Sequence, residues 1–384
     1  MPLIGSADMS FMRSYALQSI IRILLLLSGV GFWPAAAATF GTVVPIGGEA
    51  ADIALDETRG VLYIANFTAG RIDVLSLADY TIHTSMHVAP GPSALALSPD
   101  QRYLVVVHFG NVTPPGSPTN ALSILDLLSG ARQTMALSDP PLGVAFGADG
   151  LALVATTTEF LLLDPASGVT QFLTTVSNVS ANSIPAAPGT PPVQIVAATM
   201  AASADGQYIF GLTDSIRFVY HASSGELLVT GYTSSPSQGP RVVSAAADGS
   251  YFAAGWAVLR RAGGLLAQFA NPTGQLAVGS HAIDSKAGVI YSQIPSLPAA
   301  NSGPAAPVLT ISDSANLTVR DQLQLPENLT GRSVLNAAAP ARCNYPVFPV
   351  GRSGRRANYL CAQLEPVRRD HQPCLRPHPG HHPG

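Results

Sequence analysis

Few side chains in this sequence are spaced for chemistry, and the histidines are the first to test. His83 and His87 are four residues apart in "IHTSMH", a spacing that would bring two metal ligands together on a helix. The segment reads as a β-strand, on which the two rings would lie about 13 Å apart. His108 and His221 each end an apolar segment, at a position where a polar side chain can reach water or a ligand, but we expect both to have a structural role. We therefore predict no metal site.

The sequence lacks the motifs that mark common catalytic and cofactor sites. It has no G-x-S-x-G, no H-E-x-x-H, no phosphate-binding loop, no G-x-G-x-x-G and no C-x-x-C-H. Asp100, Asp149, Asp205 and Asp248 recur at one register, which would also suit a ring of carboxylates. Each lies in a short polar turn, so we expect them to form turns. We predict no catalytic residues and no cofactor.

Three polar residues share a second register and are the candidate ligand-binding residues. Ser93, Arg241 and Arg332 each lie seven residues before the recurring turn position, in loops rich in glycine and proline. Two arginines at the same rim of the ring could hold an anionic group with bidentate hydrogen bonds. The alternative is that they only make the surface soluble.

These registers are parts of one repeated unit. Seven segments align on the turn: "DIALDET", "ALALSPD", "GVAFGAD", "TMAASAD", "VVSAAAD", "SHAIDSK" and "SVLNAAA". They recur at intervals of 38 to 56 residues, which fits the blade period of about 40–50 residues of a β-propeller with four strands per blade and loop insertions in the longer copies. The small apolar "ALAL" suits an innermost strand, "SPD" turns the chain, and "RYLVVV" returns as a strand packed between neighbouring sheets.

The repeat predicts an all-β fold, a β-propeller of seven four-stranded blades over residues 39–340. The last blade is expected to be incomplete, because "ARCNYPVFPV" offers at best one strand and contains two prolines. "TFGTVVPIG" (39–47) resembles an outer strand without a blade of its own. It could complete the last blade and close the ring, or remain a free N-terminal strand.

The repeat resembles that of the YVTN-type bacterial β-propellers, which are exported or surface proteins. The best matches are "GVLYIANFTAGRIDVLSL" (60–77) and "ALSPDQRYLVVV" (96–107). The resemblance implies the propeller fold and a bacterial source. It implies little about activity, because related propellers include scaffolds, lactonases and oxidoreductase subunits.

Residues 1–38 are predicted to be a signal peptide that forms a helix. Arg13 and Arg22 precede the apolar run "ILLLLSGVGFW", and Ala36 and Ala38 give the small-x-small pattern of a cleavage site. The run is short for a bilayer span, so we expect cleavage before Thr39 and no stable membrane span afterwards. An uncleaved membrane anchor is the alternative. The mature protein is expected to be secreted, periplasmic or on the cell surface.

The C-terminal region, 341–384, differs from the repeats in composition. It contains all three cysteines (Cys343, Cys361 and Cys374) and is rich in arginine and histidine. It could be disordered, translated from a shifted reading frame, a metal-binding tail or a basic arm. We predict the first or second of these. The chain as a whole has a net charge of −3, so no nucleic-acid partner is expected.

Two functions from different classes remain open. The first is an exported propeller that binds a protein, peptide or glycan on the loops before its inner strands. The second is a lactonase-like hydrolase that works through the central pocket, which needs acid–base side chains converging near the axis. Because the inner strands are small and apolar, the sequence favours the binding or scaffold module.

Overall fold

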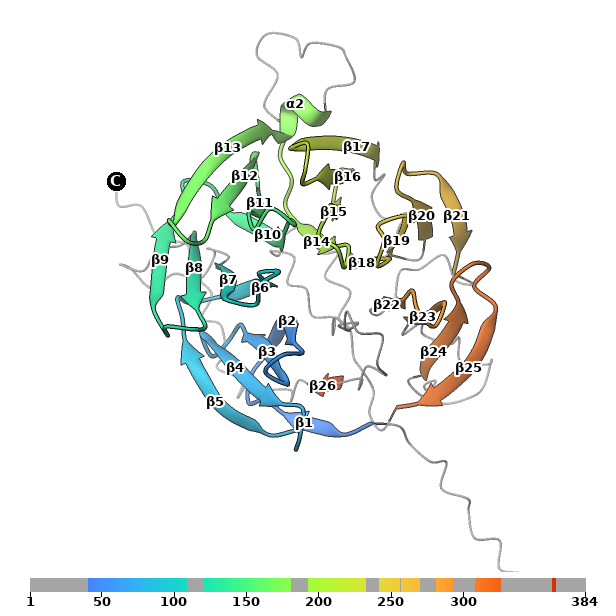
Figure 1. The fold of residues 1–384 in the computed structure, drawn as a ribbon, viewed down its shortest axis with the longest axis horizontal. Helices are drawn as coiled ribbons and strands as arrows, with labels where there is room; N and C mark the ends of the chain where they lie inside the picture. The colour runs from blue at the N-terminus through green and yellow to red at the C-terminus, as the bar shows by residue number, and fades with distance from the viewer. Residues whose placement is uncertain are drawn as a thin grey trace, which may run out of the picture. The chain divides into compact units, whose positions relative to one another are not determined.

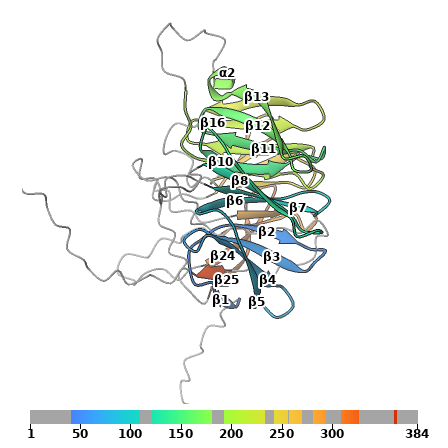
Figure 2. The ribbon, with the colours of Figure 1, turned by 90° about the vertical axis from the view of Figure 1, so that its left-hand side faces the viewer.

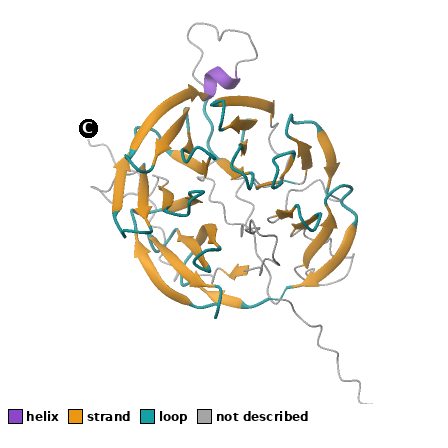
Figure 3. Cartoon of the chain, viewed as in Figure 1, coloured by secondary structure: helices purple, strands orange, loops and turns teal. Residues whose placement is uncertain are grey.

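The computed structural model describes residues 41–108, 120–180, 193–232, 242–255, 257–269, 281–292 and 308–325, and the backbone of 361–363. Within these ranges every regular element is a β-strand except one short helix, α2 (Val176–Ser180) (Figure 3). The predicted all-β class is confirmed.

Six four-stranded sheets make up the described fold. Each is built from four strands that are consecutive in the sequence and pair antiparallel with their neighbours. The first three are β2 (Ala50–Asp56), β3 (Val61–Asn66), β4 (Arg71–Ser76), β5 (Ile82–His87); β6 (Pro92–Leu97), β7 (Tyr103–His108), β8 (Ala121–Asp126), β9 (Arg132–Ala136); and β10 (Pro141–Phe146), β11 (Ala152–Thr156), β12 (Glu159–Asp164), β13 (Val169–Thr175).

The other three sheets repeat this order of strands. They are β14 (Ala198–Ala202), β15 (Tyr208–Thr213), β16 (Ile216–His221), β17 (Glu226–Tyr232); β18 (Val243–Ala245), β19 (Tyr251–Ala254), β20 (Ala257–Arg260), β21 (Leu265–Gln268); and β22 (His281–Asp284), β23 (Val289–Ser292), β24 (Val308–Asp313), β25 (Val319–Gln324).

The sheets stand around a common axis as the blades of a propeller (Figure 1). The first strand of each blade is innermost, and β2, β6, β10, β14, β18 and β22 contact one another in that order. The fourth strands form the circumference. Figure 2 shows β2 and β5 of one blade running in clearly different directions, as expected from the twist of a sheet.

Burial follows the position of a strand within its blade. In the second blade β7 reads "YLVVVH" and is buried from Leu104 to His108, because it lies between two neighbouring sheets. The outer strand β9 reads "RQTMA" and is mostly exposed. The second strand is apolar because both of its faces are packed against other blades. The fourth strand is more polar because it lies at the circumference and is largely exposed.

The hydrophobic core lies between the blades. Leu104 and Val106 of the second blade pack with Ile72 of the first. Phe160 of the third blade packs with Phe218 of the fourth, with ring centroids 5.0 Å apart in an edge-to-face geometry. Each blade therefore depends on its neighbours to cover its faces.

The prediction of seven four-stranded blades is wrong for the described residues, which form six. The segment 333–339, which would begin a seventh, lies outside the described residues. The predicted closing strand does form, as β1 (Val43–Pro45), but it pairs in parallel with β26 (Cys361–Gln363) in a two-stranded sheet. Val44 and Ile46 are buried against Leu62, Ile64 and Leu75 of the first blade.

Two other predicted segments lie outside the described residues. These are the signal peptide, 1–38, and most of the C-terminal region, 341–384. No helix among the residues that the structure describes is long and apolar enough to span a membrane.

Candidate functional site

The two rims of the propeller differ in the length of their connections. We call the rim where the first strand of each blade ends the short-turn rim. All twelve connections there have four or five residues, such as 98–102 and 127–131. At the opposite rim, which we call the long-loop rim, five connections have ten residues or more: 109–120, 176–197, 233–242, 269–280 and 293–307. Loops of this length on a rigid scaffold are where binding residues concentrate.

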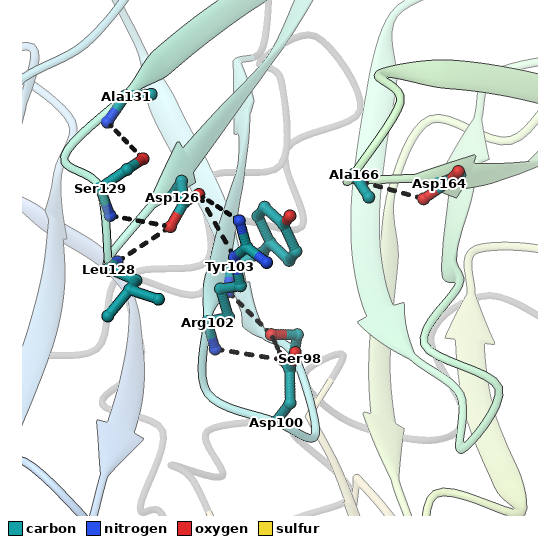
Figure 4. A network of polar contacts seen from close by, with 10 residues as sticks. All are labelled: Ser98, Asp100, Arg102, Tyr103, Asp126, Leu128, Ser129, Ala131, Asp164 and Ala166. Carbon is teal, nitrogen blue, oxygen red and sulfur yellow. Dashed lines mark hydrogen bonds and ion pairs between the residues drawn. The ribbon is translucent and has the colours of Figure 1, made fainter.

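The recurring aspartates build the turns of the short-turn rim, as the sequence predicted. Asp100 accepts hydrogen bonds from the Ser98 hydroxyl at 2.5 Å and from the Arg102 backbone N–H at 3.1 Å (Figure 4). Asp205 repeats both contacts, with Ser203 and with the Gln207 N–H. The hydrogen bond from Ser98 lowers the pKa of Asp100 below its ordinary value.

An ion pair fixes the neighbouring turn on this rim. Arg102 Nη2 lies 2.9 Å from Asp126 Oδ2, and its guanidinium lies 4.9 Å from the ring centre of Tyr103 (Figure 4). Asp126 also accepts the N–H groups of Leu128 and Ser129. Asp100 and Asp126 thus have hydrogen-bond or ion-pair partners within their own or the neighbouring turn, and their role at this rim is structural.

Buried polar side chains end the second strands at the long-loop rim. They occur in every described blade except the fifth, where β19 ends at Ala254, and all are at most 1% exposed. They are Asn66, His108, Thr156, Thr213 and Ser292.

In the first two blades this position anchors a hydrogen-bond chain across the sheet. Asn66 donates to Asp73 Oδ2 at 2.9 Å, and Ser85 donates to Asp73 Oδ1 at 2.5 Å. In the second blade His108 Nε2 lies 2.8 Å from Ser123 Oγ, which lies 2.8 Å from Thr134 Oγ1. His108 is fully buried, which agrees with the structural role that the sequence favoured and leaves its side chain unable to reach water or a ligand at this position.

A second histidine–serine contact joins the inner strands of the fifth and sixth blades. Ser244 Oγ lies 2.7 Å from His281 Nδ1, and Phe269 stacks near the imidazole. Burial lowers the pKa of both His108 and His281 to about 4, so both are neutral at pH 7.

A serine beside a neutral imidazole is the start of a nucleophile–base arrangement, in which a third group orients the base. Here His108 Nδ1 and His281 Nε2 are buried and make no hydrogen bond to a described side chain. The polar groups that interact with the two rings besides serine are backbone groups, of Ala89 and Pro90 for His108 and of Val242 and Gly255 for His281. Among the described residues, no carboxylate orients either imidazole as in a hydrolytic triad.

One carboxylate on an innermost strand has an unusual environment. Asp52 of β2 reaches across to the second blade, where Oδ2 accepts the Leu95 N–H at 2.8 Å, while Oδ1 accepts the Ile53 N–H. Burial between the strands outweighs these two bonds and raises the pKa of Asp52 to about 7. Among the described inner strands, Asp52 and His281 are the titratable side chains nearest the long-loop rim.

The structure describes one of the three predicted ligand-binding residues. Ser93 lies in β6 at an irregularity of the ladder, and its hydroxyl donates to the Val107 carbonyl at 3.3 Å. Arg241 and Arg332 lie outside the described residues. The structure therefore does not bring these three residues together.

Of the three remaining histidines that the structure describes, His83 and His221 have local side-chain partners. His83 and His87 lie on the exposed strand β5, as predicted, and His83 Nε2 contacts Asp79 at 2.7 Å. His221 contacts the hydroxyls of Ser223 and Ser224 and stacks on the Tyr208 ring at 4.8 Å. Within the described part of the chain, no group of three histidine, cysteine or acidic side chains could hold a metal ion.

Sequence reasoning did not identify His281, Asp52 or Arg217 as unusual. Asp52 is the first residue of one repeat copy and His281 is the second residue of another, and the local pattern does not distinguish either from its neighbours. Their environment depends on the next blade. For Arg217 a sequence signal existed, because an arginine stands in a strand position that is apolar in the other blades.

Solved structures with similar folds include known propellers. The β-propeller domain of Myceliophteria thermophila Cps50 (Swd1) matches with a TM-score of 0.52 and 13% identity, over 76% of this chain and 90% of that domain. Kuenenia stuttgartiensis hydrazine synthase matches with a TM-score of 0.40 and 16% identity, over 73% of this chain. That match spans just under two thirds of the hydrazine synthase chain, 66%, and its TM-score supports no argument.

The similarity to the Cps50 domain agrees with the β-propeller fold of the described residues and shows nothing about activity. No protein-family profile matches the sequence, and no characterised protein matches it.

Proposed function

We propose that this β-propeller is an exported binding or scaffold module that holds a protein, peptide or glycan on its long-loop rim. The observation that carries the proposal is the difference between the two rims. Every connection of the short-turn rim has four or five residues, whereas five connections of the long-loop rim have ten or more. A rigid ring with long loops on one side is a common basis for recognition.

The proposal is tested by exchanging a connection on each rim. Replacing 109–119 with a short glycine–serine linker alters the long-loop rim, and replacing 127–131 with a turn of the same length alters the short-turn rim. The probes are a glycan array and a displayed peptide library, screened with the intact protein. We expect the first exchange to abolish the selected binding and the second to retain it. Binding that survives the first exchange and fails after the second would contradict the proposal.

Ser93, Arg241 and Arg332 are proposed to contribute to this rim. Their common register, seven residues before the recurring turn position, supports this role, and the two arginines provide bidentate donors for an anionic group of the ligand. We expect Arg241→Ala and Arg332→Ala to weaken binding without lowering the melting temperature. A large drop in melting temperature would instead assign the arginines a structural role.

A lactonase-like hydrolase is the second candidate, favoured by the pKa of about 7 at Asp52, because a carboxyl group that titrates near neutrality suits general acid–base catalysis. Hydrolysis of aliphatic lactones by the purified protein, lost in Asp52→Asn, would replace the binding proposal. Binding without turnover would support the first candidate.

We also propose that the chain belongs to the YVTN-type bacterial propellers and is exported. The "LYIAN" and "SPDQRY" repeats support the family, and the arginines and apolar run of residues 1–38 support a cleaved signal peptide. The proposed domains are the signal peptide 1–38, the propeller 39–340 and a separate region 341–384. N-terminal sequencing of secreted protein should start near Thr39. A retained Met1 or Met12 would contradict export by cleavage.

A further inference from the structure

We propose that Arg217 forms a binding site for an oxyanion, a carboxylate or phosphate group, at the long-loop rim between the fourth and fifth blades. Arg217 is the second residue of β16, which begins at this rim. The inference does not rest on the proposed function, because an oxyanion can bind here whether or not the rim holds a larger partner.

Arg217 is an exception within the repeat. It pairs with Leu212, one residue before the end of the second strand. The residues with the corresponding pairing in the other described blades are all apolar: Ile72, Leu122, Phe160, Val258 and Ile311.

The same position faces the next blade in the ring. Ile72 packs with residues of the second blade, Leu122 with residues of the third, and Phe160 with residues of the fourth. Arg217 therefore places its guanidinium toward the fifth blade, where the other blades place an apolar side chain.

A glycine makes room for this guanidinium. Gly231 lies opposite Arg217 in the ladder, at the end of β17. A Cβ atom on Gly231 would lie 2.1 Å from Arg217 Nη2 and 2.9 Å from Cζ. The corresponding partners of Ile72 and Leu122 are Met86 and Met135, so the arginine and the glycine replace a pair of larger apolar residues together.

Among the residues that the structure describes, the Arg217 guanidinium has no counter-ion. Arg217 Nε is buried without a hydrogen-bond partner, although the side chain as a whole is only half-buried. The ion pairs among the described residues involve other basic side chains. Asp214, three residues before it, accepts the N–H groups of Val196 and Ala197 instead. Burial without a neighbouring negative charge lowers the pKa of Arg217.

Two hydroxyls that are close to Arg217 in the sequence or in the ladder are also unsatisfied. Ser215, two residues before Arg217, and Thr230, next to Gly231, each have a buried hydroxyl oxygen without a partner. The segments 181–192, 233–241 and 270–280, which adjoin these blades outside the described residues, contain no aspartate or glutamate. A half-buried cation with free donors needs an anion, and these segments supply none.

An oxyanion is the ligand that these groups fit. A guanidinium presents parallel N–H donors that match the two oxygens of a carboxylate or phosphate, and hydroxyls can donate further hydrogen bonds. Because part of the Arg217 side chain is exposed, the ligand can approach from the rim.

The test is thermal unfolding of the full chain with inorganic phosphate, acetate or chloride at equal ionic strength. We expect phosphate, acetate or both to raise the melting temperature by about 3–5 °C at roughly a hundredfold excess over Kd, with chloride as the reference. The response to each anion distinguishes a phosphorylated ligand from a carboxylate. Isothermal titration with the same anion should give one site per chain.

Arg217→Leu, which restores the residue of the second blade, should abolish the anion-dependent rise. Arg102→Leu removes an arginine that is paired with Asp126 on the other rim and should retain it. Gly231→Ala should also reduce the rise, because the added Cβ displaces the guanidinium while the charge remains. The proposal is overturned if neither oxyanion stabilises the wild type more than chloride does, or if Arg217→Leu retains the full rise.

Discussion

At the scale of single residues, the Asp52 side chain links two blades through a hydrogen bond and makes the stability of the protein depend on pH. Its carboxyl group spans from β2 to the Leu95 N–H of the second blade, and burial raises its pKa to about 7. Between about pH 4 and pH 7 the folded protein keeps a proton that the unfolded chain releases. Stability from this group is therefore greatest at acidic pH and falls as the pH rises toward 7.

Asp52→Asn should remove this dependence on pH. The amide cannot ionise, and its oxygen can still accept one of the two backbone N–H groups. We expect the free energy of unfolding, measured by urea denaturation, to fall by a few kcal/mol less between pH 4 and pH 7 than in the wild type. Asp313→Asn is the control, because the hydrogen bond from Arg320 lowers the pKa of Asp313 and its effect has the opposite sign. Equal slopes in Asp52→Asn and wild type would contradict the argument.

The buried histidines act in the opposite direction to Asp52. Burial lowers the pKa of His108 to about 4, whereas an unfolded histidine titrates near 6.5. As the pH falls from about 6.5 to about 4, His108 becomes protonated in the unfolded chain but stays neutral in the folded protein, so the folded protein loses stability. His108→Gln lacks this ionisable group. Its free energy of unfolding, relative to that of the wild type, should therefore be higher at pH 4.5 than at pH 7. The same relative stability at both pH values would show that His108 is not the group responsible.

At the scale of elements, the fourth blade depends on a glycine in its second strand. Gly211 lies opposite Phe218 in the ladder, and a Cβ atom there would lie 2.0 Å from Phe218 Cζ. Phe218 is fully buried and makes the edge-to-face contact with Phe160 of the third blade. The absent side chain in one strand thus permits the aromatic contact between two blades.

Gly211→Ala should destabilise the protein by about 1–3 kcal/mol, because the added methyl group must displace a buried ring. The matched control is Gly264→Ala, since a Cβ at Gly264 meets nothing within 4 Å. Urea denaturation of both variants measures the difference. If the two variants were equally stable, Phe218 would have an alternative rotamer that the packing does not indicate.

At the scale of the whole molecule, the N-terminal strand covers one face of the first blade. Val44 and Ile46 are 5% and 2% exposed, and they pack with Leu62, Ile64 and Leu75. This face has no preceding four-stranded blade among the described residues. Stability of the ring therefore depends on a strand of three residues and its flanks.

Ile46→Ala should cost about 2–4 kcal/mol, a typical value for truncating a buried isoleucine. Val319→Ala, at a side chain that is 50% exposed on β25, should change the free energy of unfolding by less than about 0.5 kcal/mol. Thermal and urea unfolding of the two variants compare them directly. A neutral Ile46→Ala would mean that β1 contributes little to holding the first blade.

The propeller fold could be predicted from the sequence because the patterns that indicate it lie within single repeats. Period-2 alternation, the Ser–Asp turns and the regular spacing of "ALALSPD"-like segments all act within one blade. They predicted the strands, the turn role of Asp100 and Asp205, and the strand conformation of His83 and His87. Patterns within single repeats do not show which distant segments pair with one another. Seven blades were therefore predicted, whereas the described residues form six four-stranded sheets.

Tertiary structure alone decided the environment of the polar groups. The sequence favoured a structural role for His108 but could not show its partner or its burial; the side chain is fully buried because its strand is covered by neighbouring blades on both faces. The pKa of Asp52 depends on its place between two inner strands, and the isolation of Arg217 depends on which residues face it from the fifth blade. Whether a charged group or a hydroxyl has a hydrogen-bond partner depends on residues that are distant in the sequence, as Leu95 is from Asp52. Local pattern therefore fixes the blade, while contacts between blades fix the chemistry at its rim.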